Sequence, residues 1–204
     1  MEKENYLEQI LLQVAEEEFI KKGFQGAKTF VIAKKAGVSL PTFYSYFKTK
    51  KDLFQIIFLQ KVKMVSVSLL MYDESLSLGE TIKNITEHHF DLIAKNPGLV
   101  KFIYNEVMSN DEHRKLLINT LSSELFDIYV KFGLMIKKEV EERKVRRINP
   151  SDLLTNMFAL NVFSFMTYSA MKDLMLKGGQ DEFDKFMKNR KESNVQFILN
   201  AIRP

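Results

Sequence analysis

The chain has 204 residues, of which 46% are hydrophobic and 27% charged, enough to build a core in one large or two small domains. Cysteine is absent, which excludes disulfides and any zinc, iron–sulfur or thiol chemistry that depends on cysteine. No signal peptide follows Met1, and the longest weakly polar run, residues 157–171, is too short and too polar to span a membrane. These features predict a soluble, cytoplasmic protein.

Positive charge is concentrated near the N-terminus. The formal net charge is +4, but residues 19–63 carry ten lysines against a single acid, Asp52. Residues 1–18 are acidic, and residues 64–204 have equal numbers of basic and acidic side chains. A local basic stretch in a folded segment is typical of a protein that binds a polyanion. The alternative is a solvated, lysine-rich face without a partner.

Helical patterns dominate the chain, and no segment alternates as a strand would, so we predict an all-α fold of about nine helices. The first helix, over residues 5–22, is expected to end at Gly23 in a left-handed conformation. Residues 30–46 form two short helices around a turn at Gly37. The remaining helices are expected over residues 50–72, 78–95, 99–109, 111–143, 152–176 and 181–201.

The two short helices have the layout of a helix-turn-helix. Gly37 supplies the turn, and apolar side chains can hold the pair together, namely Ile32, Ala33, Val38, Phe43 and Phe47. No acid occurs in this unit before Asp52, and its helix N-termini offer free N–H groups to phosphate oxygens. In such a unit the second helix lies in the major groove of DNA.

Three motifs connect this part of the chain with a known family. They are I-L-x-x-x-A from Ile10, F-x-x-x-G-F from Phe19, and T-x-x-I-A-x-x-A-G-V-S-x-x-T-F-Y-x-Y-F-x-x-K from Thr29. With these motifs the chain resembles the N-terminal domain of the TetR family of bacterial transcriptional repressors. The domains that the resemblance implies are a helix-turn-helix DNA-binding domain (1–49), a linker helix (50–72) and a helical C-terminal domain for effector binding and dimerisation (73–204).

The resemblance also implies which residues contact DNA. The implied phosphate contacts are Lys28, Thr29, Tyr44, Tyr46, Lys48 and Lys50. The residues implied to lie near base edges are Ser39, Leu40, Pro41, Thr42 and Ser45. For the two tyrosines, packing is the alternative role.

Three features depart from the family pattern. Pro41 stands where glycine is common, Lys51 stands where glutamate is common, and the recognition helix has no Arg, Asn or Gln. The usual bidentate readers of guanine and adenine are therefore missing. We expect an A/T-rich operator, read through hydroxyl groups, thymine methyls and DNA shape.

The expected helix over residues 152–176 is apolar nearly all round, so it must be covered on more than one side. A second copy of the chain is the simplest cover. The dimer interface we predict contains Phe165, Met166, Ala170, Phe197 and Ile198.

Aromatic and methionine side chains crowd the helices before and within this segment, which suits an adaptable cavity for an apolar small molecule. The pocket we predict contains His89, Phe90, Phe102, Tyr104, Met108, Phe126, Tyr129, Phe158, Asn161 and Met166, with Glu106 and Tyr168 as further polar candidates. Packing in the core is the alternative for each aromatic residue.

The sequence therefore predicts a homodimeric, ligand-responsive repressor that binds a palindromic, double-stranded operator and is released by an unidentified apolar effector. We expect no catalytic activity, cofactor, metal or membrane contact, because adjacent histidines point apart on a helix and no nucleophile motif or Gly-rich phosphate loop is present. The alternative is an all-α lipid-binding protein or enzyme whose basic N-terminal segment binds a membrane or phosphate.

Overall fold

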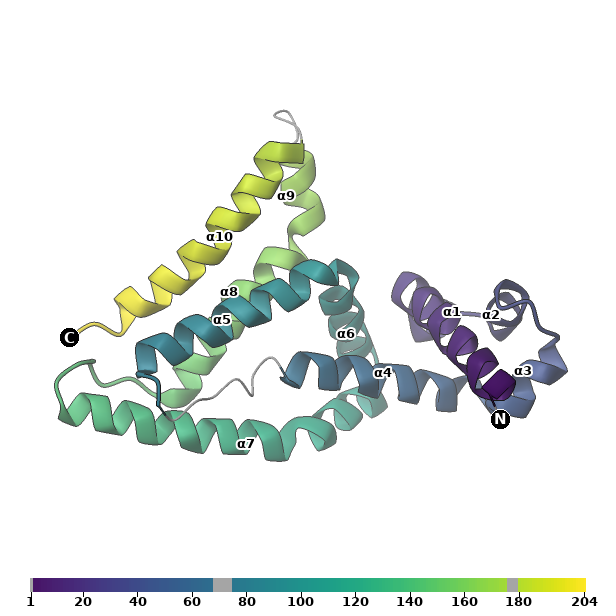
Figure 1. Ribbon diagram of the computed structural model, residues 1–204, viewed down its shortest axis with the longest axis horizontal. Coiled ribbons are helices and arrows are strands. Elements are labelled where there is room, and N and C mark those ends of the chain that lie inside the picture. The colour runs from purple at the N-terminus through teal and green to yellow at the C-terminus, as the bar shows by residue number, and fades with distance from the viewer. Residues whose placement is uncertain (1, 68–74, 176–179) are drawn as a thin grey trace. The chain divides into compact units, whose positions relative to one another are not determined.

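The computed structural model describes residues 2–67, 75–175 and 180–204, and within these ranges all regular structure is helical (Figure 1). The helices are α1 (Glu2–Gly26), α2 (Thr29–Lys35), α3 (Leu40–Tyr46), α4 (Lys50–Val67), α5 (Leu78–Lys95), α6 (Pro97–Ser109), α7 (Asp111–Glu141), α8 (Pro150–Met166), α9 (Tyr168–Met175) and α10 (Gln180–Ala201). The predicted all-α class is confirmed. In the part of the chain described, no helix combines the length and the apolar character that crossing a bilayer requires.

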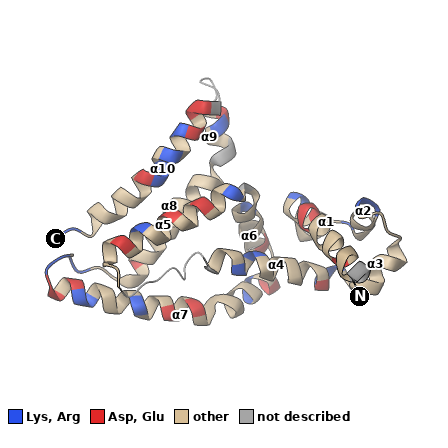
Figure 2. Cartoon of the chain, viewed as in Figure 1, with Lys and Arg blue, Asp and Glu red and all other residues tan. Residues whose placement is uncertain are grey.

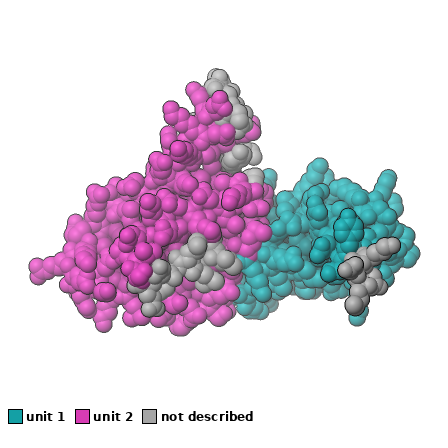
Figure 3. All heavy atoms as spheres, viewed as in Figure 1, with its two compact units in different colours: residues 1–63, 101–120 teal, residues 64–100, 121–204 magenta. Residues whose placement is uncertain are grey.

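The chain forms two compact units, which Figure 3 colours separately. The first unit contains Met1–Lys63 and Lys101–Thr120, and so joins α1, α2, α3 and most of α4 to most of α6 and the start of α7. The second unit contains Met64–Val100 and Leu121–Pro204. The helix-turn-helix therefore has its own core, to which residues far along the chain contribute.

Aromatic rings form the core of the first unit. Phe19 of α1 and Phe54 of α4 are fully buried, and their ring centroids lie 5.1 Å apart in an edge-to-face arrangement. Phe58, one turn further along α4, stacks on Phe54 at 5.4 Å. Burial of a phenylalanine side chain contributes about 1.5–3 kcal/mol, so this cluster is a major source of stability for the unit.

α1 does not end at Gly23 as predicted. Gly23 has a positive φ of 68°, but its ψ of 174° is not that of a left-handed helix stop, and a further helical turn follows it to Gly26. The reason lies outside the helix: the N–H of Phe24 donates to Oε1 of Glu106 instead of to a carbonyl of the preceding turn. The glycine produces a kink, and the helix resumes.

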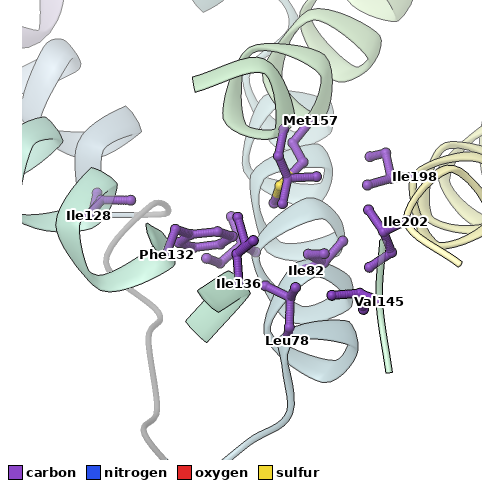
Figure 4. Packing of buried hydrophobic residues seen from close by; sticks show 11 residues of the cluster. Leu78, Ile82, Ile128, Phe132, Ile136, Val145, Met157, Ile198 and Ile202 are labelled. Atoms are coloured by element: carbon purple, nitrogen blue, oxygen red, sulfur yellow. The ribbon is translucent and has the colours of Figure 1, made fainter. Parts of the chain in front are cut away.

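The core of the second unit lies between α5, α7, α8 and α10. Figure 4 shows Phe132 and Ile136 of α7 meeting Leu78 and Ile82 of α5, with Met157 of α8 beside them. The cluster is completed by Ile85, Ile128, Val145, Leu153, Ile198 and Ile202. α5 begins at a capping box, since Ser77 and Glu80 bond each other's backbone N–H groups.

The long helix predicted over residues 152–176 is two helices. α8 ends at Met166 and α9 begins at Tyr168, so the break falls at Thr167. The hydroxyls of Ser164 and Thr167 bond back to the carbonyls of Leu160 and Phe163, and such back-bonding bends helices. The predicted end of the helix from Lys50, over residues 68–72, lies outside the described residues.

A buried polar network crosses α5, α8 and α10. The side-chain amide of Asn161 donates to the carbonyl of Thr86 (2.8 Å) and to Nδ1 of His89 (3.2 Å). Asn194 in turn donates to the Asn161 side-chain oxygen (2.9 Å). Because Nδ1 of His89 accepts, the ring is neutral with its proton on Nε2.

This histidine predicts a pH dependence of stability. Burial, and to a smaller extent the charge of His88, lowers the pKa of His89 to about 4, against 6.5 for an unperturbed histidine. Below pH 6.5 the unfolded chain binds a proton at His89 that the folded chain does not bind. The stability that His89 contributes is therefore constant above pH 6.5 and falls towards pH 4. We expect a loss on the order of 3 kcal/mol across this window, measured by urea unfolding. His89→Gln should remove most of the slope, and an unchanged slope in that variant would contradict the assignment.

Candidate nucleic-acid interface

The turn between α2 and α3 is fixed by its backbone. The N–H of Val38 bonds the carbonyl of Ala33 and the N–H of Gly37 bonds that of Lys34, which is the Schellman pattern. Gly37 has a φ of 73°, the conformation that favours glycine. α3 then starts at Ser39, whose side chain accepts the N–H of Thr42 (3.1 Å).

The two helices are held by a small buried set, with Ile32 and Ala33 on α2 and Phe43 and Phe47 at α3. Tyr44 also connects them, because its hydroxyl lies 3.3 Å from that of Thr29 at the start of α2. Tyr44 remains 44% exposed, so it both positions α3 and offers a surface to a partner. The packing role weighed for this tyrosine is present, and its contact with phosphate stays a prediction.

Most of the predicted DNA contacts lie at the surface of this unit. The exposed residues among them are Lys28, Ser39, Pro41, Tyr44, Ser45 and Lys48. The half-buried ones are Thr29, Leu40, Thr42, Tyr46 and Lys50. Figure 2 shows basic residues and no acid on α2, and no charged residue on α3. The structure therefore presents these side chains on a small helical unit that carries positive charge.

The hydroxyl groups of Ser39, Thr42 and Ser45 are each held by a hydrogen bond within this segment. Oγ of Ser39 lies 2.7 Å from Oγ1 of Thr42, and Oγ of Ser45 donates to the carbonyl of Thr42 (2.7 Å). Each hydroxyl has one donor and two acceptor positions, so these bonds orient the groups and leave capacity for a further partner. The hydroxyls are preorganised on the first turn and a half of α3.

Lys50 has a different environment from the phosphate contact that was predicted. Its ammonium donates to the carbonyls of Phe24 (2.8 Å) and Ala27 (3.0 Å) and lies 4.6 Å from the centre of the Phe24 ring. Two of its three N–H donors are therefore used inside the protein. We correct its role to that of a brace for the chain between α1 and α2, which no local sequence pattern signals.

This correction leads to a matched pair of expected results. Lys50→Ala should lower the free energy of unfolding by about 1.5–3 kcal/mol, because two hydrogen bonds to a charged group are lost. Lys48→Ala, at an exposed lysine two residues away, should leave stability within about 0.5 kcal/mol. Chemical unfolding of both variants measures the difference. Equal free energies of unfolding would show that the hydrogen bonds of Lys50 do not stabilise the protein, and would contradict its role as a brace.

Two other lysines of the first unit, Lys35 and Lys51, form ion pairs with acidic side chains. Lys35 pairs with the buried Glu18 (2.9 Å), and Lys51 pairs with Glu112 of α7 (2.6 Å).

Phe30 was not predicted as a site residue, and its ring is 62% exposed on α2. Its position opposite the buried Ile32 was the available signal, because residues two apart lie on opposite sides of a helix.

A buried carboxylate joins the first unit's two segments. Glu106 of α6 accepts the N–H of Phe24 through Oε1 (2.6 Å) and the Nδ1–H of His113 through Oε2 (2.9 Å). The His113 ring stacks on Phe54 with centroids 4.3 Å apart. A Cβ on Gly23 would come within 2.9 Å of Glu106 Oε1, so any other residue there would have to displace this carboxylate. Both carboxylate oxygens of Glu106 are thus engaged at this junction, which lies in the first unit and not in the second, where the other polar pocket candidates His89 and Asn161 lie.

The other predicted pocket residues are divided between the units. Phe102, Tyr104 and Met108 belong to the first unit, where Phe102 packs on Phe54 and Met108 is 67% exposed. His89, Phe90, Phe126, Tyr129, Phe158, Asn161 and Met166 belong to the second. Of these, His89, Phe158 and Asn161 lie together, whereas Phe126 is 65% exposed. The side chain of Tyr168 lies outside the described residues.

The predicted dimer interface also needs correction. Phe165 and Ile198 are buried in the core of their own unit, so they have no surface to offer a partner. Met166, Ala170 and Phe197 are exposed, as such an interface requires. Phe163, two residues from Phe165 on α8, is 65% exposed and was not predicted.

The segment that contains the helix-turn-helix matches a known protein family. Residues 11–57, which run from the first half of α1 to the middle of α4, match the sequence model of bacterial regulatory proteins of the tetR family. The helix-turn-helix segment is therefore that of a tetR-family regulator. It is 33% identical over 97 residues to the HTH-type transcriptional regulator YdgC of Bacillus subtilis, covering 45% of this chain and 49% of YdgC. The match thus spans about half the length of that relative.

Two other proteins match a larger part of the chain. The Transposon Tn10 TetC protein of Escherichia coli is 25% identical over 143 residues, which is 68% of each chain. The crystal structure of the transcriptional regulator FadR from Bacillus subtilis, in complex with stearoyl-CoA, superposes with a TM-score of 0.65 at 18% identity. That superposition covers 96% of this chain and 99% of FadR, so the fold is shared along the chain.

Proposed function

We propose that the protein is a repressor that binds a palindromic operator as a homodimer and is released by a mainly apolar small molecule. The DNA-binding function rests on the α2–α3 unit, in which preorganised hydroxyls and exposed lysines share an acid-free surface. Domain 1–49 would contact DNA, with the helix over 50–72 as the linker to an effector and dimerisation domain over 73–204. The match of residues 11–57 to the tetR family supports this assignment.

Base contacts and phosphate contacts have separate tests. A labelled duplex from the region upstream of the protein's own gene should bind more tightly than a scrambled duplex at about 150 mM salt, measured by fluorescence anisotropy. Lys48→Ala should weaken both complexes and reduce the salt slope by about one unit, because one phosphate contact is lost. Thr42→Ala should instead change the preferred sequence. Equal affinity for the two wild-type duplexes would contradict the proposal.

The dimer is proposed to form through α8 and α10, which pack together in the second unit. Their outer surface carries Phe163 and Phe197, which are 65% and 63% exposed, with Met166 beside Phe163 on α8. Large aromatic side chains in water are costly unless a partner covers them. A two-fold dimer would pair this surface with itself and present two recognition helices to a palindromic operator.

The effector is proposed to bind in the second unit. The FadR structure that shares this fold holds stearoyl-CoA, and α7 exposes a row of apolar side chains, namely Leu125, Phe126, Tyr129, Val130 and Leu134. Stearoyl-CoA should therefore be titrated with and without saturating operator, beside shorter acyl chains. Release requires that the operator weaken effector binding by the same factor as the effector weakens operator binding. Equal effector affinities in both titrations would exclude the switch.

A further inference from the structure

A cleft opens in the first unit between the end of α1 and α6. Its volume is about 410 Å³, and its lining comes from residues 20–25 on one side and 101–110 on the other. This volume falls within the usual range for small-molecule sites. The cleft is separate from the α2–α3 surface and from the second unit, where the effector is proposed to bind.

The lining of this cleft is rich in positive charge. Lys21 and Lys22 come from α1 and Lys101 from α6, and all three are exposed. Within the described ranges none of them has an ion pair or hydrogen-bond partner, unlike Lys35 and Lys51 of the same unit. Three unpaired ammonium groups around one hollow create a positive potential that attracts anions.

The one acid in the lining, Glu106, makes no ion pair with these lysines, and the three lysines outnumber it, so the lining keeps a positive formal charge. Glu106 is 5% exposed, and its two oxygens are taken by the N–H of Phe24 and by His113. The side-chain amides of Gln25 and Asn105 also line the cleft and add neutral donors. Phe102 and Ile20 supply an apolar part of the wall. The lining therefore combines donors for anionic oxygens with a limited apolar contact.

We propose that this cleft binds a small organic polyanion that carries at least two carboxylate or phosphate groups. An exposed ion pair contributes only about 0–1 kcal/mol, so a single charge would bind weakly, whereas a ligand that engages all three lysines gains from each. The size of the cleft admits such a molecule. The ligand would connect α1 to α6, the same two helices that Glu106 and Phe24 connect.

The test is calorimetric titration of the full chain at constant ionic strength, with citrate as the carboxylate probe and fructose 1,6-bisphosphate as the phosphate probe. We expect saturable binding of at least one probe, one molecule per chain, and no binding of trimethyl citrate, the neutral control. The double variant Lys21→Gln/Lys101→Gln should bind the probe at least tenfold more weakly. The control pair Lys83→Gln/Lys188→Gln removes the same charge from exposed lysines of the second unit and should bind as the wild type does.

Three outcomes would overturn the proposal. One is the absence of saturable binding for both probes, and another is equal weakening in the control pair, which would show an effect of net charge alone. The third is a loss of operator affinity in the Lys21/Lys101 variant together with competition between probe and operator, which would assign these lysines to DNA. Operator binding by the wild type is measured separately, so this inference can fail while the proposed function stands. A probe that binds should also raise the melting temperature, since it binds only the folded state.

Discussion

Gly23→Ala should destabilise the protein far more than Gly37→Ala, although both glycines have a positive φ near 70°. At Gly37 a Cβ would meet nothing within 4 Å, so the cost is the backbone conformation alone, about 1–2 kcal/mol. At Gly23 the ψ of 174° belongs to a region that is essentially restricted to glycine, at about 1–3 kcal/mol. The new Cβ would also displace Glu106, with a further loss of about 1.5–3 kcal/mol for a charged hydrogen bond.

Urea unfolding of the two variants measures this difference. We expect a loss of roughly 3–5 kcal/mol for Gly23→Ala, which is a large fraction of the stability of a typical domain. Operator affinity should fall with it, because the carbonyls that Lys50 holds lie directly after the kink. If both alanine variants lose the same amount, the contact between Gly23 and Glu106 contributes nothing.

Phe163→Glu is the substitution expected to abolish dimerisation. The side chain is 65% exposed in the single chain, so the change leaves the monomer core intact and places a charge in the proposed interface. Truncation of a central aromatic residue in an interface costs about 2 kcal/mol or more, which is about 30-fold in the dissociation constant, and a buried unpaired charge adds to it. Affinity for a palindromic operator should fall in parallel.

Phe126→Glu is the matched control, because Phe126 has the same 65% exposure but lies on α7. Sedimentation at micromolar concentration should show a dimer for the wild type and for Phe126→Glu, and a monomer for Phe163→Glu. A monomeric wild type would refute the proposed assembly. Monomers from Phe126→Glu alone would move the interface to α7.

The local chemistry of the helix-turn-helix could be predicted because its signals lie within a few residues. Ser39 caps the third N–H that follows it, and Gly37 takes the positive φ that a Schellman turn requires. The buried positions on α2 and α3 follow from their helical spacing in the same way. Here the physical cause and its sequence signature are both local.

The register of α8 could not be predicted for the opposite reason. Phe163 and Phe165 have similar side chains on a helix that is apolar nearly all round, so periodicity does not indicate which of them faces outward. The decision is made by α5, since Phe165 packs on Phe90 with ring centroids 4.8 Å apart. That contact joins residues that are 75 positions apart in the sequence.

The same limit applies to the junction in the first unit. Glu106 bonds Phe24 across 82 residues, and Lys50 bonds it across 26. Neither side chain differs, in its own neighbourhood, from an exposed acid or a surface lysine. Only the folded structure shows that both side chains form hydrogen bonds to the backbone of Phe24.

The hydrogen-bonded hydroxyls of Ser39, Thr42 and Ser45 have a consequence for gene regulation. An arginine that reads guanine in a bidentate manner rejects other bases sharply, whereas a hydroxyl rotates to donate or to accept and is satisfied by several. On the proposed function, a mismatch at such a position lowers affinity gradually. The protein would then occupy a graded series of related promoters, and its cellular concentration would determine how far down that series repression extends.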